Sequence, residues 1–208
     1  MYVPHAFEVG DRETILRAIE AWGFATLVSH GARGLEATHV PLLLERGRGD
    51  AVDRLVGHVA RGNPQRDAFD GATPALAIFH GPHAYVSPAW YARGPAVPTW
   101  NYGAVHVHGR PRAVEDAAAV STLLDRMIER YESARARPWV PALPDDFRRG
   151  MERGIVAFTM EVERIEAKFK LGQNRSADDR RGTLAGLEAE GDPASRALAA
   201  FTREQLGD

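Results

Sequence analysis

Two lysines and an arginine stand close together near residue 170, and residues of these types bind anions. The stretch from Lys168 to Ser176 reads Lys-Phe-Lys-Leu-Gly-Gln-Asn-Arg-Ser. It combines ammonium groups, a guanidinium fork and two side-chain amides just before an expected helix N-terminus, where free backbone N–H groups also favour negative charge. Of the 26 basic residues only two are lysine, Lys168 and Lys170. The pattern predicts an anion site. A general preference for arginine and a solvated basic loop would account for the same residues.

A second dense segment, residues 80–109, is rich in large rings. It holds two of the four Trp, three of the five Tyr and four of the eight His. Such amphipathic rings pack against flat ligands and are enriched at subunit interfaces. We therefore expect this segment to contact an aromatic ligand, a second subunit or both. Aromatic residues that simply cover one end of the fold are the structural alternative.

The histidines and serines of the chain give no strong catalytic or metal-binding pattern. The pairs His80-x-x-His83 and His106-x-His108 have no carboxylate close in sequence, and their spacing is not that of an established zinc or iron site. Ser87 does not lie in a Gly-x-Ser-x-Gly elbow, the strained turn that exposes a nucleophile. We expect no bound metal and assign no catalytic residue.

The composition limits the class of protein. The chain has 208 residues, 44% of them hydrophobic and 26% charged, no cysteine and a formal net charge of -2. This length fits one large domain or two small ones, and the absence of cysteine excludes disulfide scaffolds and thiolate chemistry. The charge balance lacks the positive excess of a dedicated nucleic-acid binder. No apolar run approaches the roughly 18 residues of a membrane span, and we expect no signal peptide. We therefore expect a soluble, cytoplasmic protein with no membrane partner.

The elements that must position these residues are mostly short strands. Alternating or apolar runs predict strands at 24–29, 35–45, 55–60, 74–80, 84–87, 102–114 and 155–165. Helical spacing and capping residues predict helices at 11–22, 115–132, 145–153, 177–189 and 193–206, and a short helix after Asn63-Pro64. The helices interrupt the strands rather than alternate with them, and no Gly-x-Gly-x-x-Gly motif opens a helix. This order favours an antiparallel barrel with peripheral helices over a doubly wound parallel sheet.

Six blocks of sequence, taken in order, resemble a known family. They are residues 1–7 (MYVPHAF), 38–42 (THVPL), 57–65 (GHVARGNPQ), 80–91, 98–102 with 105–106, and 168–176. Each block is short, but together they run nearly end to end and are similar to the PaiB-type FMN-binding negative transcriptional regulators of the FMN-binding split-barrel superfamily. The last thirty or so residues carry little of the resemblance.

The resemblance implies a mainly β (α+β) fold: a six-stranded split β-barrel of the FMN-binding type with peripheral helices and a helical C-terminus. Residues 1–175 would form the FMN-binding split-barrel domain, and residues 176–208 a C-terminal helical extension packed on the same domain. The protein would be a homodimer with FMN sites at the subunit interface.

The resemblance also implies which residues contact the cofactor FMN. The rings of Trp90, Trp100 and Tyr102 would lie beside the isoalloxazine or complete its pocket across the dimer. Thr38, His39, His58 and Asn63 would line the flavin or its ribityl-phosphate chain from the strands of one subunit. Lys168, Lys170, Gln173 and Arg175 would supply phosphate or ring-edge contacts from the same or the other subunit. The full expected set is Thr38, His39, His58, Asn63, Ser87, Trp90, Thr99, Trp100, Asn101, Tyr102, Lys168, Lys170, Gln173 and Arg175.

One position departs from the family pattern. Where we expect a small hydroxyl residue, this chain has Gly172. The backbone can still approach a ligand there, but a side-chain hydrogen bond is missing.

The resemblance implies a flavin-binding regulator of transcription, with DNA as a partner. The residues give direct DNA binding little support, because binding depends largely on phosphate neutralisation. No helix-turn-helix with an arginine-rich second helix is evident, and the two C-terminal helices are joined by the acidic Glu190-Gly191-Asp192. Regulation would then be indirect. The alternative is an FMN-dependent oxidoreductase, a reductase or oxidase of a small substrate, since a bound flavin exchanges electrons. A third interpretation is a flavin-binding sensor or carrier, so the sequence leaves the question of enzymatic activity open.

Overall fold

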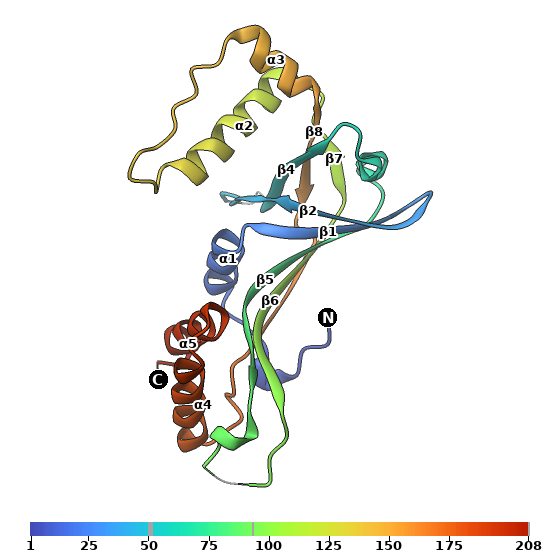
Figure 1. The fold of residues 1–208 in the computed structure, drawn as a ribbon. Helices are drawn as coiled ribbons and strands as arrows, with labels where there is room; N and C mark the ends of the chain where they lie inside the picture. The colour runs from blue at the N-terminus through green and yellow to red at the C-terminus, as the bar shows by residue number, and fades with distance from the viewer. Residues whose placement is uncertain (50–51, 93, 208) are drawn as a thin grey trace. The chain divides into compact units, whose positions relative to one another are not determined.

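A computed structural model describes residues 1–49, 52–92 and 94–207 of the chain (Figure 1). The described strands are β1 (Phe24–Gly31), β2 (Gly34–Pro41), β3 (Leu43–Glu45), β4 (Arg54–Ala60), β5 (Ala75–Val86), β6 (Thr99–Gly109), β7 (Pro111–Ala113), β8 (Ile155–Glu161) and β9 (Arg164–Lys170). The described α-helices are α1 (Arg12–Ala21), α2 (Ala117–Glu132), α3 (Asp145–Arg153), α4 (Ala177–Glu190) and α5 (Pro193–Leu206). Short 3-10 helices are η1 (His5–Phe7), η2 (Pro64–Ala68) and η3 (Pro88–Trp90). None of the helices in these ranges is long and apolar enough to cross a membrane.

The strands form two sheets. One has the strand order β2-β1-β5-β6-β9, and the other has the order β3-β4-β8-β7. The pairs β1–β2, β1–β5, β3–β4, β4–β8 and β7–β8 are all antiparallel. The chain therefore has the expected mixture of α and β structure, with antiparallel sheets. The expected count of six strands is wrong: the described ranges contain nine strands in two sheets and no closed barrel.

The strand count rises because three long runs divide where the backbone leaves one ladder, and two of them do so at Leu42 and Arg110. The run 35–45 divides at Leu42, whose N–H donates to the Gly23 carbonyl at 2.7 Å, so β2 and β3 join different sheets. The run 102–114 divides at Arg110. Before it, Gly109 lies so close to the backbone of Glu161 that a side chain would not fit. After it, Pro111 has no N–H with which to continue a ladder.

The third long run also divides, and two other expected runs merge into one strand. The run 155–165 divides into β8 and β9, because the N–H groups of Val162 and Glu163 donate to carbonyls at Asp53 and His108, both at 2.9 Å. The reverse happens at 74–80 and 84–87, which form the single strand β5 through Gly81-Pro82. A Cβ at position 81 would overlap the Trp22 ring, so the glycine is required for packing rather than for a turn.

The helices agree with the capping signals in the sequence. Asp11, Asp116, Ser176 and Asp192 each accept a hydrogen bond from a backbone N–H in the first turn of α1, α2, α4 and α5. Asn63 does the same for η2. Each side chain satisfies a donor that the helix itself leaves free, which is why α1, α4, α5 and η2 begin where the sequence predicts. Helix α2 begins at Ala117, two residues after the predicted start, because Asp116 is its N-cap.

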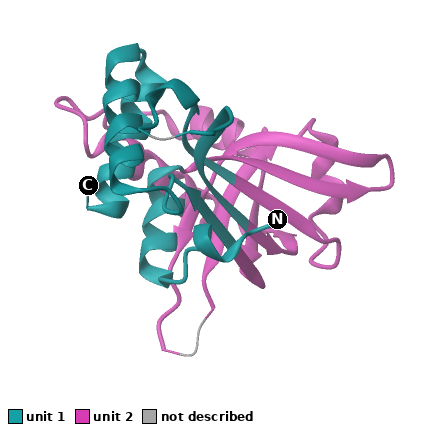
Figure 2. Cartoon of the chain, turned by 90° about the horizontal axis from the view of Figure 1, so that it is seen from below, with its two compact units in different colours: residues 1–22, 79–106, 166–208 teal, residues 23–78, 107–165 magenta. Residues whose placement is uncertain are grey.

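Contacts within the chain define two compact units (Figure 2). Unit 1 comprises residues 1–22, 79–106 and 166–208, and unit 2 comprises residues 23–78 and 107–165. Three of the four boundaries fall inside β5, β6 and β9, and the fourth lies between α1 and β1. The division expected from the sequence, at residue 175, stays a prediction.

Each unit has an aromatic cluster in its core. In unit 1, Trp22, Phe169 and Phe201 pack with ring centroids 4.9–5.6 Å apart. In unit 2, Phe69 and Phe158 lie 4.5 Å apart. In unit 1 the cluster ties the C-terminal helix α5 to β9, the strand that carries both lysines.

Candidate functional site

The candidate site in unit 1 centres on three cations, Lys168, Lys170 and Arg175. In the described part of the chain no carboxylate forms an ion pair with any of them. The Lys170 Nζ donates to the Trp100 carbonyl at 2.8 Å and to the Thr99 hydroxyl. The pKa of Lys170 is lowered, first by burial and then by the charges of the other two cations. Three positive groups that lie close together, without a carboxylate among them in the described ranges, form a site suited to an anion.

Lys168 is held by aromatic faces rather than by a counter-charge. Its side chain is 8% exposed, and its Nζ lies 5.8 Å from the ring centre of Tyr2 and 5.3 Å from that of Tyr102. The same atom donates to the Tyr2 carbonyl at 3.3 Å. Cation–π contacts stabilise a desolvated ammonium without neutralising it, so the positive charge stays available to a ligand.

The turn after β9 shapes the approach to these cations. Gly172 has φ +87°, a left-handed conformation that glycine adopts without strain. This conformation explains a glycine where we expected a hydroxyl residue. Both polar atoms of the Gln173 side chain are used inside the turn, because Oε1 accepts from the Leu171 N–H and Nε2 donates to the Phe169 carbonyl. The Arg175 guanidinium lies 4.5 Å from the ring centre of Tyr91.

Aromatic side chains of β5 and β6 lie near the two lysines of β9. Trp100 is 55% exposed, and its ring lies 6.3 Å from that of Tyr85 and 6.4 Å from that of His83. Together with Trp90 and the start of α5 these side chains line a cavity of about 340 Å³. Asn101 and Tyr102, which follow Trp100 in the sequence, also lie on β6, and the Asn101 side chain is buried. The rings therefore offer an apolar surface beside a cationic one.

The segment that carries Trp90 is docked on α4. A Cβ on Gly182 would overlap the Trp90 carbonyl, and one on Gly186 would overlap its indole. The buried Asp179 carboxylate accepts from the Ala92 N–H at 2.9 Å. Ser87 acts as the N-cap of η3, since its hydroxyl accepts from the Ala89 N–H at 3.2 Å. These contacts hold the ring in place without any ligand.

Four expected site residues belong to unit 2. The Asn63 amide donates to the Thr38 hydroxyl at 2.9 Å. The His39 Nδ1 lies 3.0 Å from the Thr26 hydroxyl. Among the described residues the buried His58 Nδ1 has no hydrogen-bond partner. Burial lowers the pKa of this imidazole, so the ring is neutral near pH 7.

Sequence reasoning missed a neighbour of this group, Gln65. Its side chain is fully buried, and its Nε2 donates to the Leu27 carbonyl at 2.9 Å and the Ser29 hydroxyl at 3.1 Å. Its Oε1 has no partner in the part of the chain that the structure describes. The signal was present, since Gln65 ends the block that begins at Gly57.

The structure thus distributes the expected set over both units. The members in unit 2 are Thr38, His39, His58 and Asn63. The members in unit 1 are Ser87, Trp90, Thr99, Trp100, Asn101, Tyr102, Lys168, Lys170, Gln173 and Arg175. Within the described ranges no group of three or more acidic or histidine side chains could hold a metal ion. The fold and this group of residues together define a class of protein. It is an α+β protein with two antiparallel sheets, and its unit 1 presents cations and aromatic rings together, as a planar phosphorylated ligand requires.

Comparison with known proteins identifies the family. The family described as "Putative FMN-binding domain" matches residues 1–164. A Bacillus subtilis protein named protease synthase and sporulation protein PAI 2 is 36% identical over 208 residues, which cover 99% of this chain and 98% of that protein. The chain therefore belongs to this family of FMN-binding domains, as the resemblance predicted, and FMN is its cofactor. The cations at 168–175 lie beyond the family match but inside the region aligned with the Bacillus protein.

Two solved structures are similar in fold. The FAD and heme binding protein from Mycobacterium smegmatis has a TM-score of 0.60 at 19% identity, covering 84% of this chain and 78% of its own. A flavocytochrome from Azotobacter vinelandii has a TM-score of 0.62 at 14% identity, covering 85% and 76%. Both likenesses concern the fold alone.

Proposed function

We propose that Lys168, Lys170 and Arg175 bind the phosphate of FMN. The observation that carries this proposal is the group of three cations with no carboxylate partner in the described ranges. A phosphate monoester carries about -1.5 to -2 charges near pH 7, which such a group would balance. Bound FMN supplies hydride and one-electron transfer. The residues of the chain contribute binding and orientation: Lys170 is already positioned by the Trp100 carbonyl and the Thr99 hydroxyl.

In this proposal the flavin ring lies on the exposed aromatic surface of β6, beside Trp100 and Tyr102. The isoalloxazine has a flat aromatic face on which a ring can stack, and Trp100 presents more than half of its surface. We further propose a split-barrel homodimer in which His58 and Asn63 of one subunit line a flavin held by the partner. The buried, unpartnered His58 Nδ1 supports this role, because a buried polar atom without a partner is rare and costly.

We propose that the protein acts as a cytoplasmic, flavin-dependent regulator of gene expression. The support is the 36% identity over nearly the whole chain to a protein named for protease synthesis and sporulation. The two C-terminal helices do not favour direct binding to DNA. The acidic residues at 190 and 192 flank their junction, and the Arg203 guanidinium is already paired with Glu188 at 2.6 Å. Control of transcription would then pass through the flavin or through a partner protein.

One observation favours the second candidate, an FMN-dependent oxidoreductase. The cavity of about 340 Å³ bordered by Tyr85, Trp90 and Trp100 is within the size range of small-molecule sites. A small substrate bound there would lie beside the proposed position of the flavin ring.

The test is a titration of the ligand-free protein with FMN, followed by flavin fluorescence and by light scattering. We expect saturation at one FMN per chain in a particle of roughly 46 kDa, twice the 22.8 kDa chain. A well-folded protein that binds no FMN would refute the proposal. Salt-dependent retardation of duplex DNA by the FMN-loaded dimer would establish direct regulation, and steady oxidation of a reduced nicotinamide would favour the enzyme.

A further inference from the structure

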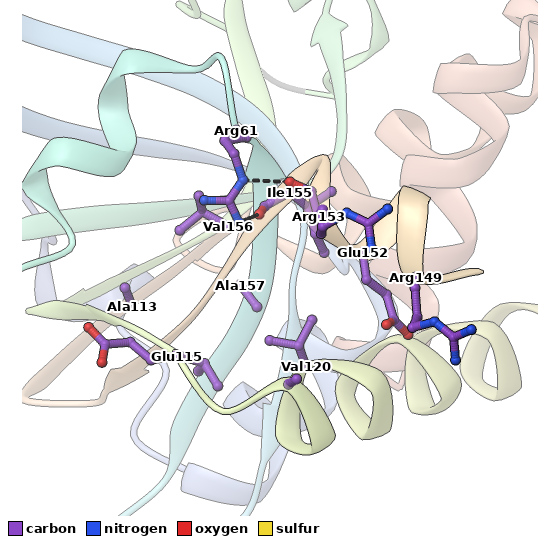
Figure 3. A pocket seen from close by; sticks show the side chains of 12 residues that line it. Arg61, Ala113, Glu115, Val120, Arg149, Glu152, Arg153, Ile155, Val156 and Ala157 are labelled. Carbon is purple, nitrogen blue, oxygen red and sulfur yellow. Dashed lines mark hydrogen bonds between the residues drawn. The ribbon is translucent and has the colours of Figure 1, made fainter. Parts of the chain in front are cut away.

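A second cavity lies wholly within unit 2, where the start of α2, the end of α3 and the first residues of β8 meet (Figure 3). Its volume is about 580 Å³. This volume falls in the range of ligand pockets, roughly 300–1,000 Å³. None of the residues expected to bind FMN lines it. The cavity is therefore a separate space with a lining of its own.

The floor of this cavity is the open edge of a hydrophobic core. Val114 and Val120 line the cavity and also pack against a buried cluster made by Leu43, Val56, Leu123, Met127 and Ala157. Ala157 is itself part of the lining, and its side chain lies in the middle of the view in Figure 3. Apolar surface left open beside a core favours a ligand with an apolar body.

The rim of the cavity carries Arg61, held in place by the main chain. Its Nε donates to the Arg153 carbonyl at 2.5 Å and its Nη2 to the Ile155 carbonyl at 2.7 Å (Figure 3). Carbonyl groups orient a guanidinium without cancelling its charge. Since Arg has five N–H donors, Arg61 keeps donors for a ligand.

The other charges on the rim leave one positive charge in excess. Within the described residues, neither Arg61 nor Arg153 forms an ion pair with a carboxylate. Arg149 pairs with Asp146 at 2.5 Å, and Glu152 pairs with Arg148 at 3.0 Å. The remaining lining charge, that of Glu115, has no ion pair in the described ranges. Two unneutralised guanidinium groups against one carboxylate leave a net charge of one.

We propose that this cavity binds an amphipathic monocarboxylate, such as a medium-chain fatty acid. The carboxylate pairs with the guanidinium groups of Arg61 and Arg153, whose planar fork matches its two oxygens. The apolar chain lies over Val114, Val120 and Ala157. A single negative charge balances the rim, and the apolar body covers the exposed edge of the core. The site is independent of the cations at 168–175.

The test is equilibrium dialysis of the full chain, saturated with FMN, against radiolabelled octanoate. Octylammonium and octanol, which have the same chain length, serve as unlabelled competitors. We expect one octanoate per chain, displaced by unlabelled octanoate and at least tenfold less well by octylammonium or octanol. Arg153→Gln should weaken octanoate binding roughly tenfold, the typical loss of one charge-assisted hydrogen bond. Arg137→Gln, which removes an exposed arginine elsewhere in unit 2, should change it less than twofold.

A second variant blocks the cavity without touching its charges. Ala117 lines the cavity at the exposed start of α2, and Ala117→Trp should abolish octanoate binding while leaving FMN binding unchanged. Equal binding to the Arg153→Gln and Arg137→Gln variants would overturn the proposal, as would undiminished binding to Ala117→Trp or equal displacement by octylammonium. Octanoate binding that occurs only without FMN would assign the cavity to the flavin and also overturn the proposal. Failure to bind octanoate with FMN binding intact would overturn this proposal and leave the proposed function standing.

Discussion

Lys170 gives the sharpest prediction about the flavin site. Lys170→Met keeps the length of the side chain and removes the ammonium that we assign to the FMN phosphate. Hydrogen bonds to charged groups contribute about 1.5–3 kcal/mol, so the loss of one should weaken FMN roughly tenfold to a hundredfold. Riboflavin has no phosphate and should lose less than threefold. Titration of flavin fluorescence gives both dissociation constants, and Arg137→Gln serves as the control for a lost positive charge.

The same variant has a pH signature in the ligand-free protein. The pKa of Lys170 is lowered from its ordinary value of 10.5 by burial and by the two neighbouring cations. The folded state then binds fewer protons than the unfolded state between the folded and unfolded pKa values, so stability rises with pH across that alkaline window. Lys170→Met should lack this rise in urea unfolding. Equal losses of FMN and riboflavin affinity would refute the phosphate assignment, and so would FMN affinity that does not change.

Three further variants test other parts of the site. Trp100→Ala should weaken the binding of FMN and of riboflavin alike by roughly tenfold, since stacking on an aromatic ring contributes about 1–3 kcal/mol. Unchanged flavin affinity together with an unchanged dimer mass would make Trp100 a surface ring only. Burial lowers the pKa of His58 from 6.5. Stability should therefore fall as pH drops below about 6.5, where the unfolded chain takes up the proton first. His58→Gln should remove that fall in urea unfolding, whereas His80→Gln should keep it. Gly186→Ala should cost about 1–3 kcal/mol, because its methyl would overlap the Trp90 indole. Gly150→Ala should instead stabilise α3 by up to about 1 kcal/mol, because its methyl would meet only the end of the Arg153 side chain, at an ordinary contact distance of 3.9 Å. Equal unfolding midpoints for the two glycine variants would contradict the docking of Trp90 on α4.

The sequence predicted the helices better than the strands. Helix starts depend on a side chain and an N–H two or three residues apart, as at Asp116 and Ser176. Strand limits depend on distant partners: Gly81 continues β5 because the Trp22 ring occupies the space of its side chain. The run that ends near Glu45 breaks because Leu42 bonds to Gly23. No local pattern contains those partners.

The composition of the candidate site could be read from the sequence, and its electrostatics could not. The segment Lys168–Ser176 stood out by residue type and spacing alone, because only two lysines occur in the chain. That Lys168 lies over the rings of Tyr2 and Tyr102 follows from packing between residues far apart in sequence. Within the described ranges, packing also decides that no carboxylate pairs with these cations and that the buried His58 Nδ1 has no hydrogen-bond partner.

The sequence by itself therefore determined the family, the caps and the chemical character of the anion-binding segment. These depend on residue identity and on contacts within a few positions. The tertiary structure alone decided that the described residues form nine strands in two sheets. It also decided that Trp90 lies on the glycines of α4, and that Arg61 and Arg153 line the same cavity beside a hydrophobic core. Strand pairing and packing bring such residues together across long stretches of chain, and burial then sets which charges stay unneutralised.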